Sequence, residues 1–411
     1  MTQTLKPTRR AAILTAASLG ASVTLLGRAA FAASEGVLAR RKLVVVICRG
    51  AMDGLSTSPP FGDPDYQSLR GEIAIPADQA LRLDATFALH PKLAAIYALS
   101  QQGQARIAPA IATPDRARSH FEAQDVLESG SAQVYSLNSG WLNRAIEALQ
   151  PQRKMEALSI GAQAPLILRG KVQAASWSPG GLKDADHRLP AILADLYAGD
   201  PVLGPALASG LATEDMAQVA AGPQDPMRPA RTPQAPRDGA RKLGETLARF
   251  MSAPDGPQIA ALEMDGFDTH ANQGAVEGLL AVRLAYVDGF VEGLHTALGE
   301  GWSDTVVVVA TEFGRTARIN GTKGTDHGTA STALLLGGAI RPGGIIGDWP
   351  TLAPAKLFEN RDTAPTLDMR ALFKGVLAEH LGLERSALDS AVFPQSAQAP
   401  PLSGLVRSPL A

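Results

Sequence analysis

The sequence predicts an α/β fold in which a doubly wound, largely parallel sheet is flanked by helices and carries an inserted lid segment. Three short, continuously apolar runs support this prediction: residues 43–47, 258–264 and 306–309. A strand that is buried on both faces reads as an uninterrupted run of Val, Leu and Ile, whereas a half-exposed strand alternates in polarity. Helical patterns separate these runs, as expected for a sheet covered by helices on both faces.

The other elements follow from local patterns along the chain. Further strands are expected at 105–112, 155–160, 166–168 and 333–336. Helices are expected at 91–102, 140–149, 241–251, 280–298 and 368–381. The helix at 280–298 has apolar residues at alternating spacings of four and three, which gives one stripe for packing on the sheet. Asp368 is suited to cap the last helix, and the final thirty residues are expected to wrap the surface or fray.

Residues 1–32 have the composition of an export signal. They contain four basic residues and no acid, then a short run rich in Ala, Ser and Thr, and they end in Ala30-Phe31-Ala32, which has the pattern of a cleavage site. The pair Arg9-Arg10 indicates the twin-arginine pathway, although an ordinary secretory signal with adjacent arginines is the alternative. We therefore expect a periplasmic or secreted bacterial protein that meets the twin-arginine translocation machinery and keeps no stable membrane span after cleavage.

The composition is that of a globular protein, with 45% hydrophobic and 19% charged residues among 411. We expect one domain over 33–411, with a lid or cap inserted around 171–238, where Pro, Ala and Gly are frequent. Without the four basic residues of the signal, 34 basic side chains face 40 acidic ones, a net charge of −6. No basic run indicates nucleic-acid binding. The single cysteine, Cys48, excludes an intrachain disulfide, and its apolar surroundings favour an inert thiol.

Polar residues gather where the predicted strands end, which is where ligands bind in open α/β sheets. Asp53 follows the first strand, either as a metal ligand or as part of an Asp–Gly turn. Asp265, Asp268 and His270 follow the strand at 258–264 within six residues. Carboxylate and imidazole groups at this spacing favour a metal site, and a polar loop with local turns is the alternative.

Two more clusters complete the set. Glu312, Arg315, Asp326 and His327 follow the four-valine run in a loop rich in Gly and Asn. Arg118 and Ser119 precede a predicted helix, where backbone N–H groups favour an anion. Ser119 is therefore a candidate nucleophile or metal-bridging hydroxyl. Its alternative is a capping box with Glu122, three residues further along the chain.

Five motifs occur in one order: RGAMDGL at 49–55, RSHFEAQD at 118–125, GFDTH at 266–270, TEFGRT at 311–316 and GTDHG at 324–328. In these motifs the chain resembles the twin-arginine-exported bacterial family catalogued as domain of unknown function 1501. That resemblance implies an alkaline-phosphatase-like fold, as in the wider superfamily of alkaline phosphatases, sulfatases and phosphoglycerate mutases. It implies that Asp53, His327 and the loop residues Asp265, Asp268 and His270 match metal ligands, and that Ser119 matches the nucleophile.

The sequence departs from the superfamily at one position. An Asp–His pair at a strand end is replaced here by Glu312-Phe313, so one imidazole ligand is missing. Either Glu312 and Asp326 replace it, or only one metal binds. A two-metal in-line displacement is therefore in doubt.

These observations lead to the expectation of an exported, metal-dependent hydrolase that acts on a small-molecule or glycan ester of phosphate or sulfate. Its divalent cation would be zinc, manganese or calcium. The candidate ligands are Asp53, Asp265, Asp268, His270, Glu312, Asp326 and His327. Ser119 would attack, and Arg118 and Arg315 would stabilise the developing charge. The alternatives are a non-catalytic envelope protein that binds a metal or an anion, and an assembly partner of another exported protein.

Overall fold

An eight-stranded sheet forms the centre of the molecule. The computed structural model describes residues 38–150 except 39, 155–178 except 162, some positions between 197 and 213, and 235–407. The strand order is β10-β4-β9-β8-β1-β7-β5-β6. The strands are β1 (Lys42–Cys48), β4 (Ala105–Ala112), β5 (Ala157–Ile160), β6 (Ala175–Trp177), β7 (Ile259–Met264), β8 (Thr305–Ala310), β9 (Ser331–Leu336) and β10 (Leu367–Asp368).

The sheet is largely parallel. Strand β9 runs antiparallel to both of its neighbours, β4 and β8, and the other neighbouring pairs are parallel. The predicted fold class is therefore confirmed. A separate antiparallel pair is formed by β2 (Leu81–Arg82) and β3 (Ala88–Leu89). Because β9 is reversed, its first residues lie at the same edge of the sheet as the last residues of β1, β7 and β8.

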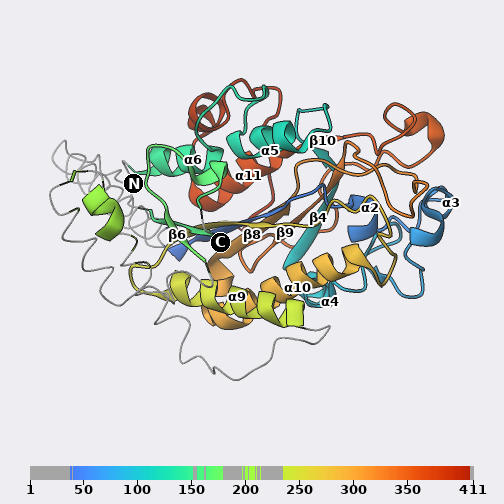
Figure 1. The fold of residues 1–411 in the computed structure, drawn as a ribbon, viewed down its shortest axis with the longest axis horizontal. Coiled ribbons are helices and arrows are strands. Elements are labelled where there is room, and N and C mark those ends of the chain that lie inside the picture. The colour runs from blue at the N-terminus through green and yellow to red at the C-terminus, as the bar shows by residue number, and fades with distance from the viewer. Residues whose placement is uncertain are drawn as a thin grey trace, which may run out of the picture.

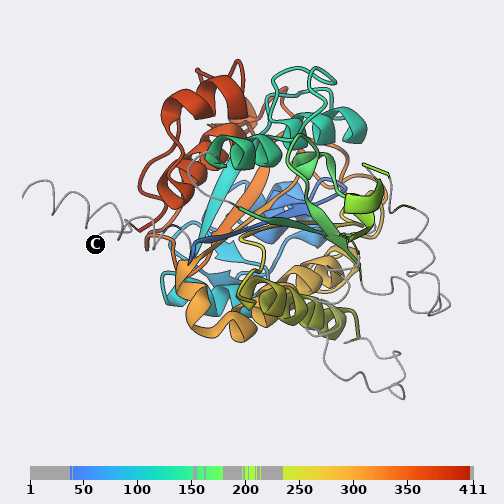
Figure 2. The same ribbon diagram turned by 90° about the vertical axis from the view of Figure 1, so that its left-hand side faces the viewer.

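Helices cover both faces of the sheet (Figure 1). One layer contains α5 (His120–Ser129), α6 (Trp141–Leu149) and α11 (Met369–Leu381), and the other contains α4 (Ala94–Gln101), α9 (Ala235–Ser252) and α10 (Leu279–Leu298). Figure 2 shows the same two layers after a 90° turn. The short helices α2 (Gly54–Thr57), α3 (Tyr66–Arg70) and α12 (Arg385–Ala387) lie in connecting segments.

Strand β1 shows why its sequence is continuously apolar. Val45 and its alternate neighbours pack in the core with α6 and α11, whereas Val44 and its alternate neighbours pack with α9 and α10. Successive side chains of a strand point to opposite faces, so both sets are removed from water. Full burial of one such side chain contributes about 1.5–3 kcal/mol. Cys48 ends this strand in the second core, where burial raises the pKa of its thiol.

Several local expectations are corrected by the structure. Leu166–Leu168 is a 3-10 turn rather than a strand; its apolar residues are buried against the helix layer, and three residues are too few to show a strand period. The insertion at 171–238 stays a prediction; within that range, strand β6 pairs with β5, and α9 begins at Ala235. Leu405 and Val406 near the C-terminus are buried in the core rather than frayed.

One capping prediction is confirmed, and two predictions concern residues that the structure does not describe. Asp368 caps α11 by accepting a hydrogen bond from the backbone N–H of Arg370 at 2.8 Å. The signal at 1–32 lies outside the described residues, as does most of the predicted lid. Across the part of the chain that the structure describes, no helix has both the length and the apolar character needed to span a membrane.

Candidate metal centre

Three histidines and one aspartate meet at the carboxyl edge of the sheet. Asp268 and His270 follow β7, His327 precedes the reversed strand β9, and His120 opens α5 after β4. His327 occupies the middle of the group: its Nε2 lies 3.0 Å from Nε2 of His120 and 3.0 Å from Nε2 of His270. Residues that are far apart in the sequence therefore bring their imidazoles together.

The carboxylate of Asp268 contacts all three imidazoles. Its oxygens lie 3.3 Å from Nε2 of His327, 3.5 Å from Nε2 of His120 and 3.0 Å from Nε2 of His270. The ligand atoms of His120, Asp268 and His327 all lie within 4.8 Å of one another. Zinc–nitrogen bonds of about 2.0–2.1 Å in tetrahedral geometry place neighbouring ligand atoms about 3.3 Å apart. The observed separations fit one transition-metal ion, with His270 as the adjacent fourth donor.

The other ring nitrogen of each histidine has a partner that accepts a hydrogen bond. Nδ1 of His327 faces the backbone carbonyl of Arg118 at 2.9 Å, Nδ1 of His120 faces Glu312 at 2.8 Å, and Nδ1 of His270 faces Asp326 at 3.2 Å. A carbonyl can only accept, and so can an ionised carboxylate. We therefore assign the proton of each neutral imidazole to Nδ1, which leaves a lone pair on each Nε2.

These lone pairs point at one another, which is unfavourable without a cation between them. A proton on Nε2 of His120 would relieve its contact with His327, but His270 faces the same lone pair at the same distance. One lone pair cannot accept two such hydrogen bonds at full strength. Histidine ligands held through the opposite nitrogen by a carboxylate or carbonyl are the usual arrangement around a bound metal. The donor set therefore fits a divalent cation.

Glu312 is the buried acid that orients His120. It accepts hydrogen bonds from the backbone N–H groups of Gly50 at 2.8 Å and Ala51 at 3.1 Å, and from the Thr311 hydroxyl at 2.9 Å. Burial raises the pKa of Glu312, but the hydrogen bonds from His120, Gly50 and Thr311 outweigh it and leave the pKa below its usual value. In return, the hydrogen bond to Glu312 raises the pKa of His120. Glu312 is thus an ionised support for a ligand.

Backbone geometry brings the loops of β1 and β7 into contact. Gly50 has φ +108°, and a Cβ at this position would lie 2.5 Å from the backbone nitrogen of Asp268. Only glycine adopts this conformation readily and allows so close an approach. Arg118 also has a positive φ of 58°, and its carbonyl is the one that holds His327. Strained backbone at a cluster of polar side chains is typical of functional sites.

The centre is open to solvent on one side. Asp268 and His270 keep 42% and 45% of their side-chain surface exposed, whereas Arg315 behind them is buried. Nη1 of Arg315 donates to Asp268 at 2.7 Å. Burial raises the pKa of Asp268, but the hydrogen bond and charge of Arg315 outweigh this effect and leave the pKa below its usual value. A buried arginine therefore holds the carboxylate in place, and a ligand can approach from the open side.

Asp53 does not join this group. Its carboxylate is buried, forms an ion pair with the buried Arg70, and accepts hydrogen bonds from Gln273 at 2.6 Å and Ser56 at 3.0 Å. It also accepts the backbone N–H of Leu55 at 3.1 Å and so caps α2. Both oxygens are occupied by protein donors. The structure thus places the predicted first-strand ligand in a closed ion-pair cluster.

Four other predicted residues lie beside the group rather than inside it. Glu312 and Asp326 support His120 and His270, and Asp265 is exposed on the loop after β7. The guanidinium of Arg118 is held by Asp362 at 2.8 Å and by Glu359 at 2.6 Å. Its backbone carbonyl, rather than its charge, is what faces the centre.

Ser119 lies at the N-cap of α5, directly before His120. Its side chain makes no capping hydrogen bond, so the predicted capping box with Glu122 does not form. Ser119 adopts the extended backbone of an N-cap, with φ −100° and ψ 124°. Its hydroxyl is thus not used to satisfy the helix terminus.

Sequence reasoning missed His120. The sequence indicated that one imidazole was absent, because Phe313 stands where the superfamily has a histidine. In the structure His120 brings an imidazole to the group from another strand end, and Phe313 packs against the rings of His120 and His327 with centroids 4.9 and 5.1 Å apart. A signal was present: His120 follows a strand and opens a helix beside Ser119.

The family pattern described as "protein of unknown function (DUF1501)" matches residues 78–392. The chain belongs to this family. The match covers α5, the loops after β7 and β8, and β9, and therefore includes His120, Asp268, His270 and His327. No curated protein matches the chain.

Solved structures show weak similarity. The phosphonate monoester hydrolase of Agrobacterium radiobacter is 12% identical over 84% of this chain and 74% of its own, with a TM-score of 0.38. The lipoteichoic acid synthase LtaP of Listeria monocytogenes is 8% identical over 86% and 76%, with a TM-score of 0.37. The periplasmic domain of EptC from Escherichia coli, in complex with Zn, is 9% identical over 72% of each chain, with a TM-score of 0.31. Scores of this size do not assign a function.

Proposed function

We propose that this protein is a metal-dependent hydrolase of phosphate or sulfate esters, with one divalent cation held by His120, Asp268 and His327. The observation that best supports this proposal is that the Nε2 atoms of three histidines lie close to one another and to the carboxylate of Asp268. His270 is the fourth donor in reach of the same ion. Three protein ligands with one position left for water or substrate are typical of catalytic zinc sites, so in this proposal His270 lies within reach of the ion without filling that position.

The donor set narrows the choice of cation. Imidazole nitrogen suits zinc and other first-row transition metals, whereas calcium takes oxygen ligands almost exclusively. Zinc and manganese therefore remain from the cations that the sequence left open. The closed Asp53–Arg70 cluster supports a count of one ion, because the guanidinium of Arg70 already neutralises that carboxylate.

Each residue around the centre would have its own role in ester hydrolysis. A bound cation would polarise the ester and neutralise charge on its oxygens. Ser119 would present its hydroxyl from the N-terminus of α5, where the backbone N–H groups favour an anion. Arg315 would keep Asp268 ionised and add positive charge behind it. Glu312 and the Arg118 carbonyl would fix the rings of His120 and His327.

Turnover of simple aryl esters tests this proposal. Protein loaded with one equivalent of zinc or manganese is expected to hydrolyse p-nitrophenyl phosphate or p-nitrophenyl sulfate. Ser119→Ala should lower kcat by about 100-fold or more and leave the metal content unchanged, since it removes the nucleophile but no ligand.

His327→Ala is expected to lose both metal and turnover. His295→Ala is the matched control, because His295 packs on Trp302 on the α10 side of the sheet. A loaded protein that hydrolyses none of these esters would contradict the hydrolase and favour a non-catalytic metal-binding role.

Export through the twin-arginine pathway remains part of the proposal. It is supported by the composition of residues 1–32 and by the pair Arg9-Arg10. Replacing both arginines with lysine is expected to leave uncleaved precursor inside the cell, measured by fractionation and immunoblotting. Normal processing of this variant would indicate an ordinary secretory signal instead.

A further inference from the structure

A cavity of about 340 Å³ lies along α5, the helix that begins with His120. One wall is a single face of α5, formed by Phe121, Gln124, Asp125 and Glu128. These residues are at positions i, i+3, i+4 and i+7 of the helix, so their side chains lie on one face. The volume is in the lower part of the range of small-molecule sites, which is about 300–1,000 Å³.

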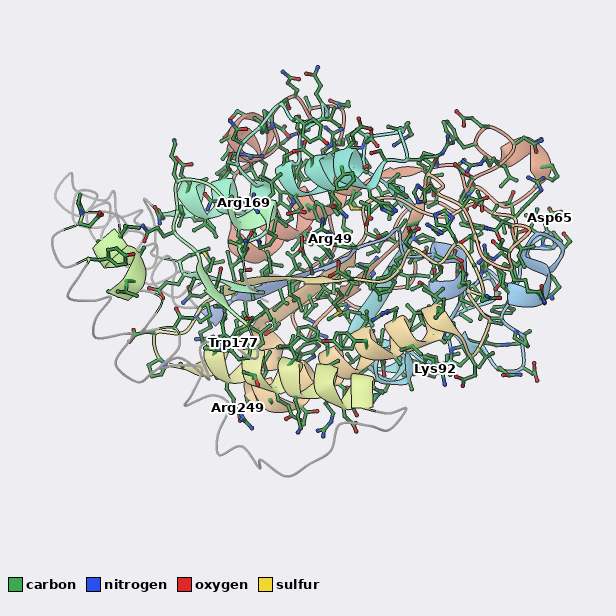
Figure 3. All side chains as sticks on the ribbon, in the orientation of Figure 1. Arg49, Asp65, Lys92, Arg169, Trp177 and Arg249 are labelled. Atoms are coloured by element: carbon green, nitrogen blue, oxygen red, sulfur yellow. The ribbon has the colours of Figure 1, made fainter. Side chains whose placement is uncertain are left out.

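Two lining residues are sequence neighbours of residues at the centre. Phe121 is the residue after His120, and Arg49 is the residue before Gly50, which donates to Glu312. Figure 3 shows Arg49 and Arg169 on the same side of the sheet as α5 and α6. A molecule in the cavity would therefore contact α5 and the loop after β1, two segments that also hold the centre.

The wall is rich in groups that can make hydrogen bonds. Arg49 bridges Glu263, at 2.8 Å, and Gln124 across the cavity lining. Glu128 is buried and uses one oxygen to accept the backbone N–H of Ile167 at 3.0 Å. Burial raises the pKa of Glu128 to about 7, so this carboxyl can also donate near neutral pH.

The wall has no excess of positive charge that would attract an anion. Asp125 and Glu263 balance Arg49 and Arg169, and the fifth ionisable group is the carboxyl of Glu128. An anionic ester group would be attracted to the cation instead, and the cavity would receive the neutral part of the substrate. Donors and acceptors spread over several walls suit a molecule that carries many hydroxyl groups, since each hydroxyl both donates and accepts.

Two exposed aromatic rings line the same cavity. Phe121 is 78% exposed and Tyr135 is 65% exposed, and the backbone N–H of Tyr135 is held by Asp125 at 2.7 Å. Aromatic side chains with free faces at the mouth of a polar cavity offer flat apolar surfaces to a ligand. The C–H face of a sugar ring is apolar while its rim is polar, which matches this combination.

We propose that the cavity is a saccharide subsite, in which Phe121 and Tyr135 stack on a sugar unit and the polar wall binds its hydroxyls. The sugar can bind in this cavity whether or not the protein is a hydrolase. That an ester group on the sugar then points toward the metal centre rests on the proposed function.

Calorimetric titration of the full mature protein tests the subsite. The probes are glucose, galactose, mannose and N-acetylglucosamine, each with its 6-sulfate. At least one neutral sugar is expected to bind with Kd below about 10 mM. Phe121→Ala and Tyr135→Ala should each weaken that binding by about 3–10-fold, since each removes one stacking face.

Leu279→Ala is the matched control, because Leu279 is an apolar residue with 56% exposure at the start of α10. It should bind sugar as the unaltered protein does. In His327→Ala the neutral sugar should still bind, while the 6-sulfate should lose its advantage over it. The subsite is overturned if no neutral sugar in the panel binds, if neither aromatic variant weakens binding, or if His327→Ala abolishes neutral-sugar binding. Loss of ester turnover alone would contradict only the proposed function.

Discussion

Two groups of polar side chains lie at the same edge of the sheet, yet they differ in what their atoms face. In the Asp53–Arg70 cluster the carboxylate is buried and every nearby partner is a donor from the protein. In the metal centre, Asp268 is partly exposed and three imidazole nitrogens turn lone pairs toward it. In the first group both carboxylate oxygens have partners from the protein, whereas the second group has a donor set that fits a cation.

The comparison shows that an acid at a strand end does not by itself make a metal site. Asp53 and Asp268 both follow buried strands of the parallel part of the sheet. Asp53 meets a guanidinium, which cannot lose its charge in proteins. Asp268 meets the imidazoles of His120, His270 and His327 as well as Arg315. The partners that the fold brings to each carboxylate decide its role.

The largest expected effect comes from opening the closed cluster. Asp53→Ala leaves the buried guanidinium of Arg70 without its counter-ion, which should lower the free energy of unfolding by about 3–5 kcal/mol. The metal content of the folded fraction should stay at one ion per chain. Urea unfolding and elemental analysis measure the two quantities. Loss of the ion from a folded Asp53→Ala protein would show that Asp53 is a ligand.

A second variant separates the lost ion pair from general disruption. Asp53→Leu combined with Arg70→Met removes both charges, and should restore part of the free energy of unfolding that Asp53→Ala loses. If the double variant is as unstable as the sum of the single variants, the two charges are not coupled.

Glu128 provides a third case beside Asp53 and Asp268. It is a buried carboxyl that lies outside both the Asp53–Arg70 cluster and the metal centre. Burial raises its pKa from 4.5 to about 7. The folded protein therefore holds a proton that the unfolded chain releases, so the free energy of unfolding should fall as pH rises from about 4.5 to above 7. Glu128→Gln lacks this titration. Between about pH 5 and pH 8.5 the variant should gain about 2–3 kcal/mol relative to the unaltered protein.

Denaturant unfolding of both proteins at the two pH values measures this difference. Glu147→Gln is the control, because Glu147 pairs with Lys171 at an exposed position. A constant difference between Glu128→Gln and the unaltered protein would mean that Glu128 is ionised in the folded state throughout.

A smaller effect, on metal affinity, is expected from Glu312→Gln. This substitution changes the hydrogen-bond partner of His120 and leaves the proposed ligand His120 itself in place. The amide can still accept from Gly50 and His120, but it removes the negative charge that strengthens the imidazole as a donor to the metal. Metal affinity should fall by about 10–100-fold, measured by competition with a chelator. An unchanged affinity would argue that His120 does not bind the ion.

Much of the fold could be predicted from the sequence, because burial on both faces leaves a plain pattern. Strands β1, β4, β7 and β8 and helix α10 appear where apolar runs and periodicity indicate them. The reversal of β9 could not be predicted, since an apolar run carries no direction. The turn at Leu166–Leu168 was misread for a related reason, because a short buried run has no measurable period.

The candidate site was only partly predictable. Asp268, His270 and His327 stand out because each lies in a polar loop next to an apolar run. Sequence could not show that Asp53 meets Arg70, since seventeen positions separate them and only the tertiary fold joins them. His120 escaped for the same reason: its partner Glu312 is 192 positions away. Local pattern identifies candidate donors, whereas packing decides which of them converge.

The most direct test of the central claim is the metal content of His120→Ala beside that of the unaltered protein. Both should be purified without added metal, with circular dichroism to establish that the variant is folded. We expect one divalent transition-metal ion per chain in the unaltered protein and less than about a tenth of that in His120→Ala, since a ligand is lost. Two ions per chain, or a folded His120→Ala that keeps its full content, would contradict this expectation.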